Sequence, residues 1–204
     1  RMEAHYVHPY DSDYSDMLVS GNSEDGTDIH TVNWKALGLP SRDVAKTFKY
    51  AITYGARPAK LSESLGVSTS VATNWYDSFW EENTGLAALL YDLKVEWSRL
   101  DKKFLLGLDG RLLTTRSEHA LLNTKLQGAG SILMKHAWIL NDAMLKKRFA
   151  REQVHGLILM HDEWQGEAHP DIAEEVGEIG CKAMRLAGEY LKLNVPISAS
   201  YKIG

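Results

Sequence analysis

The longest regular pattern in this sequence is an apolar repeat over residues 118–149. It recurs every three or four residues, at Leu122, Leu126, Ala129, Leu133, His136, Leu140 and Met144. That spacing is the period of one face of an α-helix. We therefore expect a single long helix over Glu118–Phe149.

Shorter patterns before and after this helix predict a mixed fold. Upstream, we expect helices over residues 42–55, 58–66, 68–82 and 85–100, the first with Ser41 as its N-cap and Gly55 at its end. Downstream, we expect hairpins over residues 104–115 and 154–168, a helix over 171–193 and a last strand over 195–202. Helices dominate up to Leu100 and mix with antiparallel strands afterwards, which indicates the α+β class.

Composition places the chain among ordinary soluble globular proteins. Of its 204 residues, 44% are hydrophobic and 25% are charged, and one cysteine excludes an internal disulfide. No signal peptide or membrane-spanning apolar run is visible, so we expect a cytoplasmic protein without a membrane partner. The net charge of -4 argues mildly against nucleic-acid binding. A local basic strip would suffice for such binding, however. One candidate strip is Lys102, Lys103, Arg111 and Arg116. The other is Lys146, Lys147, Arg148 and Arg151, which could equally be cations at a helix C-terminus.

One face of the helix expected over residues 42–55 combines two cations with an aromatic ring. Arg42, Lys46 and Tyr50 are spaced i, i+4 and i+8, so they stack on successive turns. Cations can bind phosphate oxygens, and a ring can lie against a base or sugar. The face suits a nucleoside triphosphate. On spacing alone, a solvated helix that carries two basic residues is an equally good interpretation.

The hairpin expected over residues 154–168 carries two carboxylates at its tip. The apolar run Leu157–Met160 leads into His161, Asp162 and Glu163. Adjacent carboxylates on a rigid turn can hold hard divalent cations through oxygen. A solvated acidic turn would have the same sequence, so this motif alone is weak evidence.

Together and in this order, these motifs resemble family A DNA polymerases, the bacterial polymerase I family, and most of all its phage replicase branch. The stretch from Arg42 to Gly55 is similar to motif B of that family, and Val154–Gln165 is similar to motif C. Three further stretches, Asp28–Thr31, Gly107–Arg111 and Ala120–Gly130, also match. The resemblance covers essentially the whole chain.

The resemblance implies a right-hand polymerase palm, an antiparallel sheet with helices, that carries a mostly helical fingers subdomain. Residues 1–27 would be a palm segment that follows motif A, residues 28–100 the fingers, and residues 101–204 the palm with the motif C hairpin. The implied reaction is nucleotidyl transfer from a dNTP to a primer 3′-hydroxyl with two Mg²⁺ ions. The implied partners are primer–template DNA, dNTPs, and either the missing N-terminal part of the polymerase or a processivity factor, in a host cytoplasm if the source is viral.

The resemblance also implies roles for single residues in catalysis and nucleotide binding. Asp162 would be the main metal ligand and Glu163 a secondary one. Lys46 would contact the triphosphate and could protonate the leaving pyrophosphate. The other dNTP contacts would be Arg42 at the γ-phosphate, His30 near the β-phosphate, Tyr50 at the sugar and base, and Tyr54 near the templating base.

Four further residues are implied as DNA contacts. Arg111 resembles a residue near the primer terminus, and His161 would orient the primer end. Asn123 and Gln127, spaced i and i+4, could donate to the minor-groove acceptors that every base pair presents.

The ends of the chain differ from the family pattern. Arg1 resembles the arginine that closes motif A, so we expect the metal-binding aspartate of that motif upstream of Arg1. No thumb or exonuclease sequence is recognisable. We therefore expect a polymerase fragment that is inactive by itself, from a natural split or from the way the chain was obtained.

Two other functions stay open on the sequence. The chain could be a remnant that holds primer–template DNA without catalysis. It could also be an unrelated metal-dependent hydrolase built on His161 and Asp162. The hydrolase interpretation needs further ligands, for which only His155 and His169 are near, and it leaves the face of Arg42, Lys46 and Tyr50 without a role.

Overall fold

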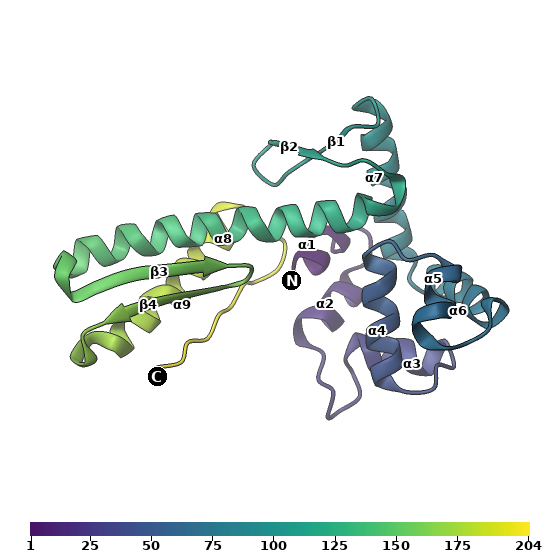
Figure 1. Cartoon of the computed structure of the whole chain (residues 1–204), viewed down its shortest axis with the longest axis horizontal. Coiled ribbons are helices and arrows are strands. Elements are labelled where there is room, and N and C mark those ends of the chain that lie inside the picture. The colour runs from purple at the N-terminus through teal and green to yellow at the C-terminus, as the bar shows by residue number, and fades with distance from the viewer. The chain divides into compact units, whose positions relative to one another are not determined.

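The structure, a computed structural model, describes residues 1–204 and confirms the α+β class. Its strands form two separate two-stranded antiparallel sheets, and helices make up most of the remainder (Figure 1). The chain divides into two compact units. The first comprises residues 1–106 and 111–126, and the second residues 107–110 and 127–204.

The first unit is mainly helical. Its elements are α1 (Met2–Val7), α2 (Ser12–Ser20), α3 (Ile29–Ala36), α4 (Arg42–Thr53), α5 (Pro58–Leu65), α6 (Thr69–Glu82), α7 (Thr84–Arg99), β1 (Phe104–Leu106), β2 (Leu112–Thr114), the 3-10 helix η1 (Glu118–Ala120) and the start of α8 (Leu121–Arg148). Side-chain caps explain several helix starts, since Ser41 accepts the Val44 N–H at 3.2 Å and Asp28 accepts the His30 N–H at 3.1 Å.

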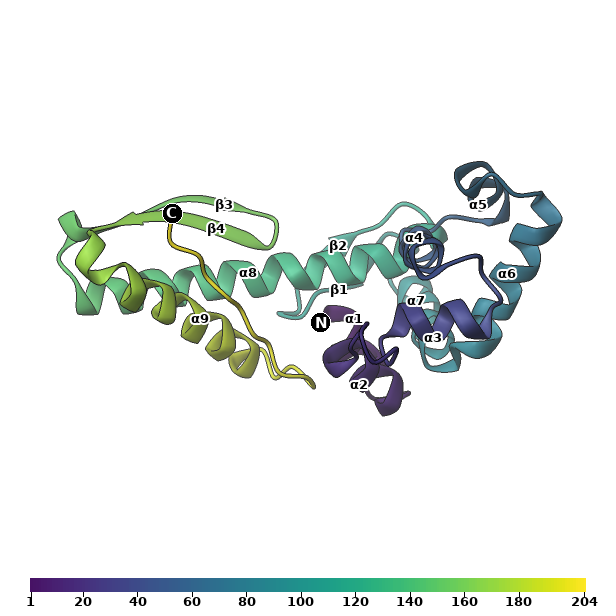
Figure 2. The same ribbon diagram turned by 90° about the horizontal axis from the view of Figure 1, so that it is seen from below.

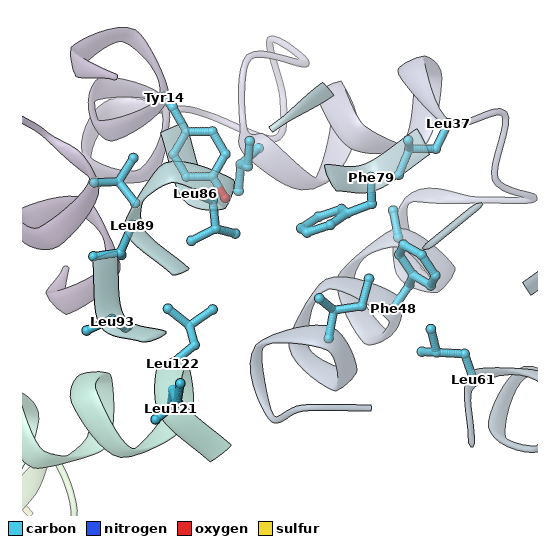
Figure 3. Close-up of a cluster of buried hydrophobic side chains, with 14 of the residues drawn as sticks. Tyr14, Leu37, Phe48, Leu61, Phe79, Leu86, Leu89, Leu93, Leu121 and Leu122 are labelled. Carbon is cyan, nitrogen blue, oxygen red and sulfur yellow. The ribbon is translucent and has the colours of Figure 1, made fainter. Parts of the chain in front are cut away.

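Aromatic packing anchors α4 in the core of the first unit (Figure 3). The Phe48 ring of α4 meets the Phe79 ring of α6 edge to face, with centroids 5.9 Å apart. Leu61 of α5 and Leu86 of α7 are fully buried in the same cluster. Burial of Ala45, Phe48 and Ile52 fixes the inner face of α4, so another face of the helix is left for solvent or ligands.

The second unit contains the longer part of α8, the 3-10 helix η2 (Arg151–Gln153), β3 (Val154–Met160), β4 (Glu163–Ala168), the 3-10 helix η3 (Pro170–Ile172) and α9 (Ala173–Tyr190). Figures 1 and 2 both show the β3–β4 hairpin running alongside α8. The Trp138 ring of α8 meets the Trp164 ring of β4 edge to face at 6.0 Å. Gly156 lies so close to the Trp138 ring that a Cβ at this position would collide with the indole. The contacts of Trp138 with Trp164 and Gly156 thus hold the β3–β4 hairpin against α8.

The secondary structure corrects the sequence-based prediction at two places. The expected helix over residues 118–149 begins with a 3-10 turn and ends at Arg148. The strand expected over residues 195–202 is wrong, since residues 191–204 contain no strand. Val195 and Ile197 are buried, Ile197 against Gly188 of α9, so the alternating apolar pattern reflects burial against a helix.

None of the helices is long and apolar enough to cross a membrane. The assignment of residues 1–27, 28–100 and 101–204 to palm and fingers stays a prediction, because the division into two units reflects compactness alone.

Candidate functional site

The outer face of α4 carries the side chains that the sequence pattern singled out. Lys46 is exposed, and Tyr50 and Tyr54 are 49% and 58% exposed. Arg42 lies two turns before Tyr50 and is half-buried. The prediction that Arg42, Lys46 and Tyr50 share an accessible helix face is therefore confirmed, while their binding roles stay predictions.

Arg42 is not a free cation, because its guanidinium is paired with Asp28. Its Nη2 donates to Asp28 Oδ1 at 2.9 Å and its Nε donates to Oδ2 at 3.1 Å. Thr31 donates to the same carboxylate at 2.5 Å. Burial would raise the pKa of Asp28, but the hydrogen bonds from Arg42, Thr31 and the His30 N–H outweigh it and lower that pKa to about 2. The Arg42 guanidinium, which was expected to bind a γ-phosphate, is thus bound to Asp28 through Nη2 and Nε, and its Nη1 takes no part in this pair.

His30 lies beside the same helix face. Its ring centroid is 5.7 Å from that of Tyr50. Its Nδ1 is buried and makes no hydrogen bond. Burial, followed by the positive charge of Lys49, lowers the pKa of His30, so the imidazole is neutral at pH 7. Because this nitrogen is buried, a ligand could satisfy it only after a movement of the His30 or Tyr50 side chain that exposes it.

A buried ion pair, which no sequence pattern predicted, lies behind this face. Lys49 Nζ contacts both carboxylate oxygens of Glu3 at 2.7 Å, and the side chain of Lys49 is 3% exposed. The Tyr14 hydroxyl donates to Glu3 Oε1 at 2.7 Å. Burial, followed by the charge of Glu3, raises the pKa of Tyr14. Because lysine is normally exposed, only the three-dimensional contact identifies this cluster.

A cavity of about 270 Å³ opens where α4 ends, within the first unit. Its wall includes the aromatic rings of Tyr76, Trp80 and Tyr91 together with Arg57 and His119. The Arg57 guanidinium contacts His119 Nδ1, with Nη2 at 2.8 Å and Nε at 3.2 Å. Gly55, the residue directly after Tyr54, is part of the lining, and the cavity combines flat apolar walls with a cation.

The second unit holds the acidic hairpin tip. His161, Asp162 and Glu163 are all exposed at the turn between β3 and β4, and His161 has a φ of 52°. The carboxylate of Glu163 accepts a hydrogen bond from Gln165 at 3.0 Å. No cluster of three or more His, Cys, Asp or Glu side chains suited to a metal ion occurs in the structure. The tip therefore offers two carboxylates of the type that Mg²⁺ prefers, as a partial ligand set.

The residues expected to contact DNA lie on α8 and the hairpin turns. Asn123 is half-buried and Gln127 is exposed one turn later in the same helix. Arg111 is exposed immediately before β2. In the second basic strip, Lys146 pairs with Asp142 at 2.7 Å and Arg148 with Glu175 at 2.6 Å. Those pairs favour the helix C-terminus interpretation of that strip.

The structure thus brings His30, Arg42, Lys46 and Tyr50 together in the first unit. His161, Asp162 and Glu163 belong to the second. Sequence reasoning missed the pairing of Asp28 with Arg42, although Asp28 stands in the stretch Asp28–Thr31 and its position before α3 is typical of an N-cap.

Comparison with known proteins identifies relatives for nearly the whole chain. The model of DNA polymerase family A matches residues 22–204. A DNA-directed DNA polymerase of Escherichia phage Phieco32 is 35% identical over 198 residues, which cover 94% of this chain and 30% of that protein. The DNA-directed DNA polymerase of Escherichia phage T7 is 31% identical over 225 residues, which cover 100% of this chain and 31% of that protein. The chain therefore spans about a third of the length of these curated relatives.

A solved structure has the same fold. It is the POL domain of Pol1 from M. smegmatis, in complex with DNA primer-template and dNTP. The TM-score is 0.78 at 20% sequence identity, over 96% of this chain and 36% of that one.

Proposed function

Because the chain belongs to DNA polymerase family A, we propose that it supplies the nucleotide-binding helix and the acidic hairpin of a template-directed DNA polymerase. The observation that carries this proposal is the accessible face of α4, where Lys46 and Tyr50 are exposed beside the unpartnered Nδ1 of His30. The reaction is the attack of a primer 3′-hydroxyl on the α-phosphate of a dNTP, with pyrophosphate as the leaving group.

On the nucleotide side, each group on this face matches a part of a dNTP. Lys46 is a mobile point charge suited to the triphosphate, and in its ammonium form it can give a proton to the leaving pyrophosphate. Neutral His30 can donate to a phosphate oxygen once a side-chain movement exposes its buried Nδ1. Arg42 is held by Asp28, so it contributes positive charge and Nη1 rather than a complete fork. Tyr50 and Tyr54 present rings for the sugar and for bases.

On the metal side, the carboxylates of Asp162 and Glu163 fit Mg²⁺ because both are oxygen donors at an exposed turn. Two bound Mg²⁺ ions would activate the primer hydroxyl and neutralise the charge that develops on the phosphates. Asp162 is proposed as the main ligand and Glu163 as the secondary one, since Glu163 already accepts a hydrogen bond from Gln165.

On the DNA side, Asn123 and Gln127 stand one helical turn apart and can donate to minor-groove acceptors without reading sequence. Arg111 and His161 are proposed at the primer end. The POL domain with the same fold is described in complex with DNA primer-template and dNTP, which supports these two partner classes. The interpretation as an unrelated hydrolase is not favoured, because the curated relatives cited above are DNA polymerases.

Nucleotide binding by the 204-residue chain tests this proposal directly. Calorimetric titration with a dNTP and Mg²⁺ should give measurable affinity, and Lys46→Ala or Arg42→Ala should each weaken it by about tenfold, the size of a charge-assisted contact. Lys60→Ala is the matched control, since Lys60 is an exposed cation of α5 that pairs only with Glu63 at the surface. No detectable dNTP binding by the unsubstituted chain, or an affinity in both α4 variants equal to that of the unsubstituted chain, would contradict the proposal.

The proposed catalytic roles can be tested only in a complete polymerase. A chimera in which residues 22–204 replace the matching part of the phage Phieco32 polymerase provides one. There, Lys46→Ala should lower kcat more than it weakens primer–template binding, because phosphate charge develops chiefly in the transition state. Arg42→Ala should act mainly on the KM for dNTP. Full activity of Asp162→Asn in the same chimera would refute the metal assignment.

A further inference from the structure

The first unit buries two lysines that the proposed chemistry does not use, Lys49 and Lys125, and Lys49 is the more deeply buried. Lys49 lies between Lys46 and Tyr50 along α4 and points inward where they face outward. We propose that Lys49, Glu3 and Tyr14 form a positioning network that fixes how α4 presents its nucleotide-binding face. This inference rests on the proposed nucleotide role of that face.

The contacts of the network are short and directional. Lys49 Nζ lies 2.7 Å from each oxygen of the Glu3 carboxylate, and the Tyr14 hydroxyl lies 2.7 Å from Oε1. The side chains of Lys49 and Glu3 are only 3% and 14% exposed. Three helices contribute one member each, with Glu3 on α1, Tyr14 on α2 and Lys49 on α4. The carboxylate therefore ties α4 to both α1 and α2 at a single point.

Stability alone does not explain why charged groups occupy this place. Two ions removed from water lose much of their hydration, and apolar residues of similar size often hold a core as well or better. What an ion pair with three short contacts adds is a unique geometry. The backbone around Lys49 is itself fixed, since Thr53 donates to the Lys49 carbonyl at 2.9 Å one turn later.

The position of Lys49 in the helix connects this geometry to the nucleotide face. Lys49 precedes Tyr50 directly and follows Lys46 by three residues, so all three move together when α4 rotates or slides. A movement that carried Tyr50 away from the ring of His30, now at 5.7 Å, would also stretch the contacts of Lys49 with Glu3. The ion pair thus resists the displacements that would misplace the dNTP contacts.

The decisive experiment separates positioning from stability with a double variant. Lys49→Met together with Glu3→Leu replaces the pair by apolar groups of similar length and leaves no buried charge without a partner. Urea unfolding should show that the double variant loses little more stability than Tyr14→Phe, because the Tyr14–Glu3 hydrogen bond is lost in both proteins. The Kd of the double variant for a dNTP with Mg²⁺ should nevertheless rise about tenfold, since small misplacements of positioning groups cost this much or more.

Two further variants complete the design. Tyr14→Phe keeps the ion pair but removes one contact to Glu3, so it should raise the Kd about two- to threefold, in keeping with one weak hydrogen bond. Lys60→Met with Glu63→Leu makes the same chemical change in an exposed pair of α5 and should leave the Kd unchanged. Should the buried double variant fail to fold, the Kd of Tyr14→Phe decides, and an unchanged value overturns the inference.

The outcomes distinguish this inference from the proposed function. If the unsubstituted chain binds no dNTP, the proposed function fails and the positioning role falls with it. If that chain binds dNTP and the stable double variant binds equally well, the proposed function stands and the network is structural only. A raised Kd in a double variant that is about as stable as Tyr14→Phe, with no effect in the control, supports positioning.

Discussion

At the scale of single residues, the ionised carboxylate of Asp28 holds the Arg42 guanidinium in a hydrogen-bonded ion pair. The pKa of Asp28 is lowered to about 2 because hydrogen bonds from Arg42, Thr31 and a backbone N–H outweigh the effect of burial. A carboxylate with a depressed pKa stabilises the folded protein above its unfolded pKa of about 4, and this contribution disappears as the pH falls towards 2. The pair with Arg42 should therefore be intact at neutral pH and lost in acid.

Replacement of Asp28 by Asn tests this linkage. The free energy of unfolding of the unsubstituted chain should exceed that of Asp28→Asn at pH 6, and the difference should shrink by about 2 kcal/mol between pH 6 and pH 2. Urea unfolding at a series of pH values measures it. When the same comparison is made in a protein that carries Arg42→Met, the change of this difference with pH should be smaller, because the Asp28 carboxylate has lost its main favourable partner. A difference that is independent of pH would show that the ion pair does not form.

A second residue-scale prediction concerns sugar selectivity at Tyr50. In the chimeric polymerase, Tyr50→Phe should raise discrimination against dideoxynucleotides by about 10- to 100-fold, the size of one hydrogen bond to a charged group. The phenolic hydroxyl can replace the missing 3′-hydroxyl near the triphosphate, whereas the ring that packs on the sugar is unchanged. The ratio of kcat/KM for a dNTP and its dideoxy counterpart measures this, with Tyr54→Phe as the control. An unchanged ratio would place Tyr50 away from the sugar.

Sequence patterns located the exposed residues of the candidate site better than their partners. The spacing of Arg42, Lys46 and Tyr50 sufficed to place them on one accessible face, because helix geometry is local. The engagement of Arg42 by Asp28 and of Lys49 by Glu3 joins residues 14 and 46 positions apart. Contacts of that kind depend on tertiary packing and produce no periodic pattern in the sequence.

At the scale of elements, the end of α4 depends on a close approach to η1. Gly55 has a φ of 90°, and a side chain at this position would collide with the backbone carbonyl of His119. Its N–H closes the helix on the Ile52 carbonyl at 2.8 Å. Glycine is thus required here both for its backbone conformation and for its lack of a Cβ.

Comparison of two glycines separates these requirements. Gly66 ends α5 with a φ of 67° but has open space around it. Gly66→Ala should cost about 1 kcal/mol from backbone strain, and Gly55→Ala about 3 kcal/mol or more because the collision adds to the strain. Urea unfolding of both variants measures the difference. Equal costs would mean that η1 moves aside freely.

The helices from α4 to α7 and both hairpins were predicted well from local signals, whereas α1, α2 and α3 were not predicted and the strand over residues 195–202 was wrong. Ser41, Asp109-Gly110 and Gly66 mark a cap, a turn and a helix end that chemistry fixes within a few residues. The segment over residues 195–202 has the alternation of a strand but no neighbouring strand with which to pair. Whether an alternating segment joins a sheet or lies on a helix is decided outside the segment, so the sequence could not settle it.

At the scale of the whole molecule, the two units differ in how much apolar surface they bury. The first unit has a continuous core that includes the fully buried Phe48 and Phe79. In the second unit, the β3 strand exposes Leu157, Ile158 and Met160 at 59%, 47% and 60%. Because apolar burial is the main favourable term in folding, the second unit should be the less stable of the two. The sequence predicted the α+β class but not this division, since α8 runs through the boundary as one uninterrupted helix.

Native-state hydrogen exchange tests this difference in stability. Amides of α4, α6 and α7 should open only near the global free energy of unfolding, whereas those of β3, β4 and α9 should exchange at a lower free energy. Leu133→Ala removes a side chain that is 6% exposed in the second unit and should lower the opening free energy there by about 3 kcal/mol. The matched change Leu61→Ala, in the core of the first unit, should instead lower the opening free energy of α4 and α6. If either substitution lowers all opening free energies equally, the two units unfold as one, and the long helix α8 couples them in spite of their separate cores.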